Sequence, residues 1–284
     1  MTTLTPTTTS PSSGVSFGGI LRSEWIKLMS LRSTIWCYAI LVFLTITLAL
    51  LFGSTISLEG ATFDASGEQA LAVQAATLSV GMSQLVIAVL GALVITGEYG
   101  TGMIRSTLTA VPTRLPALYG KIVVFGAVTF VVSLASMVVA ALLTAPLLEG
   151  NGINVDLSDP AYWSALVGAA GYLALSGIFA TAIGTIVRNS AGAIAIVLGF
   201  ILVIPTIVQV FALITLQEWI ANLSAFLPSN AGSRMYAYVA ESAASDPLGL
   251  GGVVLEPWQG ALVLLAWIAG LLVLASVLLK RRDA

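Results

Sequence analysis

The 284-residue sequence contains no histidine and only one cysteine, Cys37. A lone cysteine excludes an intrachain disulfide and any metal site built from several cysteines. The absence of histidine removes imidazole metal ligands, Ser/His and Cys/His nucleophile pairs, and the commonest side chain for proton transfer. We therefore expect neither catalytic residues nor a metal site in this chain.

Charged residues are also scarce. They make up 8% of the sequence, whereas hydrophobic residues make up 58%. Soluble proteins contain about 25% charged residues, so this composition indicates an all-α integral membrane protein surrounded by lipid. The bilayer is an expected partner, and nucleic acid is not.

Six long stretches lack aspartate, glutamate, lysine and arginine altogether. Each is long enough for one helical crossing of a bilayer, which takes about 20 apolar residues, and none comfortably holds two. We predict six transmembrane helices in a domain covering residues 33–284. The stretches are Ser33–Leu58, Gln69–Gly97, Ile122–Leu148, Pro160–Val187, Asn189–Gln217 and Pro257–Leu279.

The few charges are unevenly distributed between these stretches. If both termini face the cytoplasm, Arg234 is the only basic residue left outside. Cytoplasmic loops of membrane proteins carry an excess of Lys and Arg, so the pattern predicts a multi-pass protein with cytoplasmic N- and C-termini. The basic residues assigned to the inside are Arg22, Lys27, Arg32, Arg105, Arg114, Lys121, Arg188, Lys280, Arg281 and Arg282.

Three segments lie outside the predicted crossings. Residues 1–14, rich in Thr, Ser and Pro, predict a disordered cytoplasmic tail without the features of a secretory signal. Residues 15–32 have apolar residues at helical intervals, which favours an interfacial amphipathic helix over a simple extension of the first crossing. Its expected interface residues are Trp25, Lys27 and Arg32. Residues 218–256 are too long for a connector and too apolar to be disordered, so we expect short extracellular helices between the fifth and sixth crossings.

The segment Gly97–Arg114, GEYGTGMIRSTLTAVPTR, forms most of the largest cytoplasmic connection. Thr101 is a candidate N-cap for a short helix that runs to Ala110. On that helix, Ile104 and Leu108 lie four residues apart and form an apolar stripe. A short amphipathic helix of this kind, lying parallel to the membrane, is suited to docking a soluble partner.

The alternative is that this segment is an inner loop that collects basic residues under the positive-inside rule. That interpretation accounts for Arg105 and Arg114. It does not account for Glu98, an acid placed at the end of a long apolar stretch. Residues alone leave both interpretations open.

The segment also carries a family resemblance. The pattern Glu98-Tyr99-x-x-Gly102-x-x-Arg105, followed by Leu108, Pro112-x-Arg114 and Lys121, resembles the inter-helix segment of bacterial ABC-type-2 exporter permeases. The lead-in SEWIKLMSLRS, the six helices and the long segment before the last one are similar to the same family. The resemblance covers nearly the whole chain from about Phe17.

The resemblance implies that the short helix is a cytoplasmic coupling helix, seated on a separate ABC ATPase subunit that binds ATP and Mg. The chain itself would bind no cofactor, and it contains no G-x-x-x-x-G-K-[ST] motif. Glu98 would anchor the turn into the helix, and the interfacial helix would brace the same ATPase. Arginines of the segment would contact the ATPase or headgroups, and its apolar residues would fill a groove. The implied coupling residues are Glu98, Tyr99, Thr101, Ile104, Arg105, Leu108 and Arg114.

The resemblance further implies export across a bacterial plasma membrane by a dimer, formed by two copies or with a related permease. The path would run between protomers along helices one, two and five, where Gln84, Gln209 and Phe211 are the candidate path residues. An apolar, mildly polar path suits an amphiphile such as a drug, a peptide antibiotic or a lipid-linked molecule. Export of an antibiotic would confer resistance.

Two other classes of function remain as alternatives. An ATP-independent carrier or channel is disfavoured because none of the six stretches contains an ionisable residue of the kind that couples transport to protons or sodium. An intramembrane enzyme is disfavoured because the chain lacks histidine and no acid falls within the six stretches. The remaining polar and small residues predict packing: Gly168, Gly171, Gly177 and Gly184 predict close helix contacts, and Pro205 predicts a kink in the fifth helix.

Overall fold

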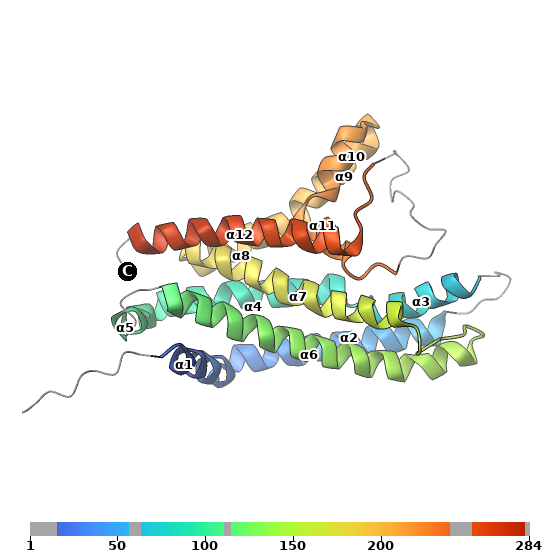
Figure 1. Ribbon diagram of the computed structural model, residues 1–284, viewed down its shortest axis with the longest axis horizontal. Helices are drawn as coiled ribbons and strands as arrows, with labels where there is room; N and C mark the ends of the chain where they lie inside the picture. Colours follow the sequence, from blue (N-terminus) through green and yellow to red (C-terminus); the bar gives the residue numbers. More distant parts are fainter. Residues whose placement is uncertain (1–15, 57–63, 111–114, 239–251, 282–284) are drawn as a thin grey trace, which may run out of the picture.

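The computed structural model describes residues 16–56, 64–110, 115–238 and 252–281, with only the backbone described at 105, 107, 108 and 110. These parts of the chain form helices and contain no strand (Figure 1). The elements are α1 (Phe17–Ser30), α2 (Arg32–Thr55), α3 (Ala65–Thr77), α4 (Val80–Thr101), α5 (Met103–Ala110), α6 (Leu115–Gly150), α7 (Pro160–Val187), α8 (Ser190–Leu198), the π-helical turn η1 (Gly199–Val203), α9 (Ile204–Thr215), α10 (Glu218–Ala225), α11 (Pro228–Arg234) and α12 (Pro257–Arg281).

Six helical spans in the described residues are long and apolar enough to cross a membrane: Arg32–Thr55, Ala65–Thr101, Leu115–Gly150, Pro160–Val187, Ser190–Thr215 and Pro257–Arg281. They confirm the prediction of an all-α protein with six membrane helices. In lipid, each backbone N–H and C=O needs a partner within the chain, and a helix supplies one locally. Several helices continue beyond the charge-free stretches, so that Glu98 and Lys121 lie inside α4 and α6.

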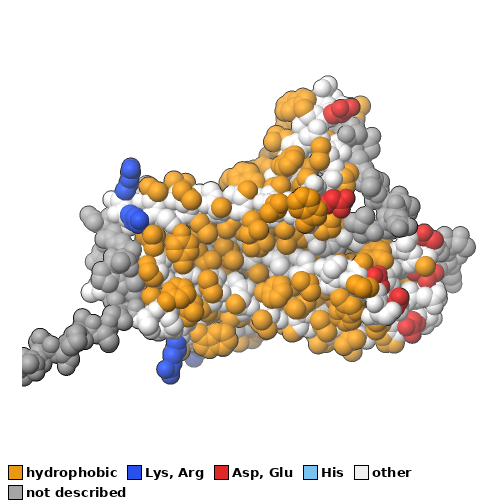
Figure 2. Space-filling view, in the orientation of Figure 1, with side chains coloured by type: hydrophobic (Ala, Val, Ile, Leu, Met, Phe, Trp, Pro, Cys, Tyr) orange, Lys and Arg blue, Asp and Glu red, His pale blue; other side chains and the backbone are white. Residues whose placement is uncertain are grey.

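The two ends of the helix bundle differ in charge. Lys and Arg side chains gather at the end formed by α1, α5 and the last turn of α12, which we call the basic end (Figure 2). Asp and Glu side chains gather at the opposite, acidic end, where α3, α10 and the α6–α7 loop lie. Hydrophobic side chains cover the surface between them. This distribution suits the predicted orientation, in which the basic end faces the cytoplasm.

Helix α7 lies at the centre of the bundle and packs against α4, α6 and α12. Its glycines allow close approach, as predicted from the sequence. A Cβ atom at Gly177 would lie 2.7 Å from Cε1 of Phe125, and one at Gly184 would lie 2.6 Å from Cγ2 of Ile95. A Cβ atom at Gly168 would overlap the carbonyl oxygen of Met235. Close packing is therefore confirmed at these three positions, whereas a Cβ atom at Gly171 would meet only Cε of Met235, at an ordinary contact distance of 3.4 Å.

The fifth span is interrupted in its middle. Proline has no N–H, so Pro205 cannot donate to the carbonyl of Ile201 one turn earlier. Ser229 of α11 donates to that freed carbonyl instead, at 2.9 Å. The π-helical turn η1 directly precedes this point. As Figure 1 shows, α8 runs along the bundle, whereas α9 and α10 lean away from it.

Helix α1 is separate from α2, because Leu31 between them is extended, with φ −82° and ψ 121°. Its buried residues Ile20, Glu24 and Leu28 follow one another at intervals of four and face the bundle. Its main neighbour is α6. Trp25, on another side, is 51% exposed. The predicted position of α1 at the membrane interface stays a prediction.

Candidate functional site

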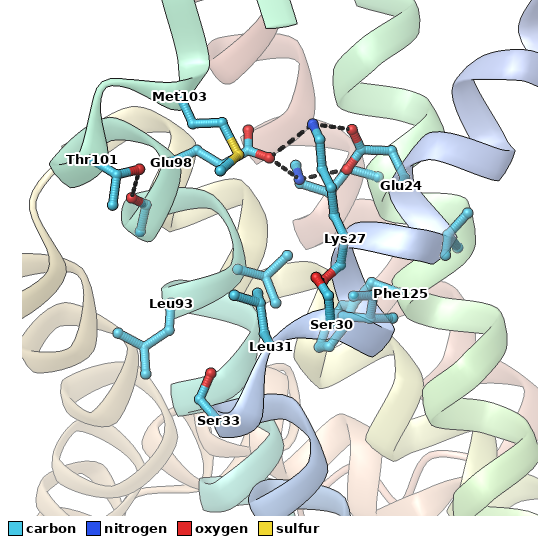
Figure 3. Close-up of a pocket in the computed structure, with 15 residues that line it drawn as sticks. Glu24, Lys27, Ser30, Leu31, Ser33, Leu93, Glu98, Thr101, Met103 and Phe125 are labelled. Carbon is cyan, nitrogen blue, oxygen red and sulfur yellow. Dashed lines mark hydrogen bonds and ion pairs between the residues drawn. The ribbon is translucent and has the colours of Figure 1, made fainter. Parts of the chain in front are cut away.

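Four charged side chains from three helices meet at the basic end. Nζ of Lys121 lies 2.6 Å from Oε2 of Glu24 and 2.9 Å from Oε1 of Glu98. Nζ of Lys27 lies 2.7 Å from Oε1 of Glu24 and 3.1 Å from the same Glu98 oxygen. Each ammonium thus contacts both carboxylates (Figure 3). We call this closed arrangement the ion ring; it joins α1 to α4 and α6.

Most of the ion ring is shielded from solvent. The side chains of Glu24, Lys121 and Glu98 are 3%, 6% and 8% exposed, and only Lys27, at 28%, is partly open. Burial lowers the pKa of Lys27. The hydrogen bonds to Glu24 and Glu98 and the charges of both carboxylates together raise this pKa by more than burial lowers it, so the net shift is upward. Two positive and two negative charges cancel, which makes their joint burial tolerable. Loss of any one of them would leave an uncompensated charge.

A cavity of about 410 Å³ adjoins the ion ring. The ring residues lie at one end of it, and Leu31, Leu93 and Phe125 line the other end (Figure 3). The second carboxylate oxygen of Glu98 is buried and has no hydrogen-bond partner among the described residues. The cavity therefore lies between an apolar part of the bundle and its densest group of charges.

The structure corrects the expected role of Thr101. Glu98 belongs to α4, about one turn before α5, and is held in the ion ring. Its expected role as anchor of the turn into α5 stays a prediction. Thr101 is the last residue of α4 and donates to the carbonyl of Gly97 at 2.9 Å, so it is not the N-cap of α5. The turn between the helices is made by Gly102, which has a left-handed φ of 73°. Helix α5 is described as far as Ala110, its predicted last residue, and residues 111–114 lie outside the described residues.

Ile104 also differs from its expected role. It is 7% exposed and packs within this chain, so it is not available to fill a groove on a partner. Among the α5 residues whose exposure is described, Met103, Ser106 and Thr109 are exposed, spaced three apart on another side of the helix from Ile104. An amphipathic pattern predicts that one side is buried, but it does not tell whether the bundle or a partner buries it.

The other predicted coupling residues are placed as follows. The guanidinium carbon of Arg188 lies over the ring of Tyr99, 5.2 Å from the ring centroid. This contact links α4 to the end of α7. The backbones of Arg105 and Leu108 lie on α5, and their side chains are outside the described set. Arg114 lies outside the described residues. Arg32 is exposed at the start of α2.

The candidate path residues fall into two places. Gln84 is buried in the bundle, where its side-chain oxygen accepts a hydrogen bond from Tyr172 of α7. This contact pairs the amide oxygen inside one chain, against our expectation that Gln84 faces a path between protomers. Gln209 and Phe211 lie on α9 and are exposed, and Phe211 is 55% exposed.

Sequence reasoning gave Glu24 no role, and it placed Lys121 in the family pattern and among the inner cations without pairing it to an acid. The apolar stretches were delimited by the absence of charge, so charges in the terminal turns of the helices were assigned to loops. The signal was present for Glu24, because it falls midway between Ile20 and Leu28 on the buried stripe of α1. An acid inside a buried stripe needs a buried cation as partner.

One comparison with known proteins decides the family. The family model for the ABC-2 family transporter protein matches residues 19–284. The chain belongs to this family. It is therefore a multi-pass membrane protein and the membrane component, or permease, of an ABC transporter, a class of subunit that associates with ABC ATPases. A search of curated proteins returned no match.

Proposed function

We propose that this permease is the membrane subunit of an ATP-driven exporter, and that it works as a dimer coupled to separate ATPase subunits through α5. The observation that carries the proposal is the ion ring. Glu98 lies one turn before α5, and its carboxylate contacts Lys27 of α1 and Lys121 of α6. A displacement of α5 would therefore be transmitted to α4, α1 and α6 together.

The connection between α5 and the ion ring supports this role. Ile104 is buried and packs within this chain, so α5 is attached to the bundle by a side-chain contact as well as by the backbone. Gly102 alone separates α5 from α4. The exposed residues Met103, Ser106 and Thr109 are the proposed contact surface for the ATPase. The ATPase would supply ATP, Mg and hydrolysis, and the permease would convert its movement into a change of helix positions.

The dimer would form a path along the helices that include α2, α4 and α9. The exposed Gln209 and Phe211 of α9 provide an amide and an aromatic ring on the same helix, which suits an amphiphilic substrate. A drug, a peptide antibiotic or a lipid-linked molecule has this character. Gln84, which is bonded inside the bundle, is not part of the proposed path.

Substitutions on α5 test the docking surface. We expect Ser106→Arg, which adds a long cation to an exposed position, and Arg105→Glu, which reverses a charge, each to lower co-purification of the ATPase by about tenfold, a loss of about 1.4 kcal/mol in binding. The measurement is a quantitative pull-down in mild detergent. Ser158→Arg, at the acidic end, is the matched control and should leave the ATPase bound.

A different outcome would favour the alternative class. If the permease purifies alone in every form and transports in vesicles that contain no ATP, it is an ATP-independent carrier and α5 is only a charged inner helix. A loss of ATPase co-purification counts only for variants that insert normally into the membrane, because a misfolded permease would fail to bind the ATPase whatever the role of α5.

The proposed orientation has its own test, for which the single cysteine is convenient. In a Cys37→Ser background, Ser158→Cys at the acidic end should react with a membrane-impermeant maleimide in intact cells. Ser23→Cys on α1, also exposed, should react only after permeabilisation. The reverse pattern would contradict cytoplasmic termini.

A further inference from the structure

Arg234, the last residue of α11, stands apart from the other cations. It lies at the acidic end, whereas the positive-inside pattern places basic residues at the other end. Its Nε donates to the carbonyl of Leu255 at 3.0 Å. Within the described part of the chain, no carboxylate lies within ion-pair distance of it. A guanidinium has five N–H donors, so most of its binding capacity is unused by these residues.

Arg234 lines a pocket of about 230 Å³ between α9, α10, α11 and residues 252–255. Ser224 and Gln209 line the same pocket. The Ser224 hydroxyl accepts from Nδ2 of Asn230 at 2.7 Å, which leaves its own O–H available to donate. Gln209 is exposed and has no hydrogen bond from its side chain to the described residues. The pocket thus combines a cation with two neutral donors.

The fold holds these donors in place. Helix α11 packs closely on α7 and α12, because Gly232 lies against the ring of Tyr172 and Gly260 lies against the carbonyl of Ala231. Arg234 is therefore carried by a well-packed helix. The break at Pro205 turns α9 away from the bundle (Figure 1), and Gln209, one turn later, faces the same pocket.

We propose that Arg234, Ser224 and Gln209 form a binding site for the anionic group of an amphiphile, a phosphate, sulfate or carboxylate. The planar guanidinium matches the paired oxygens of such groups. The apolar part of the ligand lies along the exposed hydrophobic side of α9, where Leu213 follows Gln209 by four residues and shares its side of the helix. Two sources offer this chemistry: the headgroup of an anionic phospholipid and an exported anionic amphiphile. Only the second source rests on the proposed function.

Binding to the full-length permease tests the site without any ATPase. In native mass spectrometry from mild detergent, phosphatidylglycerol and dodecyl phosphate should bind more tightly than phosphatidylcholine. Arg234→Gln should weaken both anionic ligands by at least about tenfold, since a hydrogen bond to a charged group contributes that much or more. Arg281→Gln, an exposed arginine at the basic end, is the matched control and should change nothing.

A second variant covers the case in which Arg234→Gln misfolds by releasing Leu255. Gln209→Leu removes a donor that makes no hydrogen bond to the described residues, so folding should be unaffected, while anion binding falls about tenfold. The proposal is overturned if wild type and the folded variants bind dodecyl phosphate equally, or if phosphatidylcholine binds as well as phosphatidylglycerol.

The source of the ligand is decided in vesicles of phosphatidylcholine that contain the permease with its ATPase. Stimulation of ATP hydrolysis by dodecyl phosphate in wild type, lost in Arg234→Gln, identifies an exported amphiphile. Binding that depends on Arg234 without any stimulation identifies a phospholipid headgroup. Absence of an ATPase partner would contradict the proposed function and leave the binding result intact.

Discussion

Replacing Lys121 with methionine is expected to lower the stability of the permease by about 3–5 kcal/mol, the usual cost of removing one partner from a buried ion pair. The side chain keeps a similar length, so little packing is lost. What changes is the charge: Glu24 and Glu98 would share Lys27 alone, and both carboxylates are largely buried. The measurement is unfolding in mild detergent, followed by helix content against denaturant or temperature.

Two further variants separate charge from packing at this site. Lys280→Met, on an exposed turn of α12, makes the same chemical change where no partner is buried, and it should be nearly neutral. Adding Glu24→Gln to Lys121→Met leaves Glu98 and Lys27 as a balanced pair of charges and should recover part of the lost stability. If Lys121→Met alone is as stable as wild type, the ion ring does not hold α1 to the bundle.

Gly91→Ala is expected to destabilise the packing of α4 on α7. A Cβ atom at Gly91 would overlap the carbonyl oxygen of Gly177, which is backbone and cannot rotate away. Thr181 donates to the Gly91 carbonyl at 3.0 Å, so a shift of the helices would also strain that bond. Overpacking of this kind costs about 1–3 kcal/mol, more than the roughly 1 kcal/mol that alanine contributes over glycine in a helix. Thermal unfolding in detergent measures the net loss.

The same helix offers a matched control in Gly81, where an added Cβ would meet no atom within 4 Å. Gly81→Ala should therefore be neutral or slightly stabilising, because only the helix propensity changes. Gly91→Val should be worse than Gly91→Ala, since its branches extend the same overlap. Equal stability of the alanine variants at positions 81 and 91 would show that α4 and α7 can separate without cost.

The sequence alone was sufficient for the architecture. Its charge-free stretches predict the six spans because lipid forces each apolar segment to satisfy its own backbone, and the helix is the local solution. Gly168, Gly177 and Gly184 predicted close contacts because only small residues let helix backbones approach in lipid. Pro205 predicted an irregular fifth helix because proline removes a backbone donor. The effect of proline on its own helix is local, and helix formation and close packing at glycine follow from the lipid that surrounds the chain.

Tertiary structure decided the site. Helical periodicity tells which residues share a side, but not which neighbour that side meets. It therefore could not assign Ile104 to the bundle rather than to a partner, nor pair Gln84 with Tyr172 of α7. Glu24, Glu98 and Lys121 are far apart in sequence, and each taken alone looks like an ordinary residue near a membrane surface. Their meeting depends on how α1, α4 and α6 pack, because Coulomb attraction between buried charges acts through space and not along the chain.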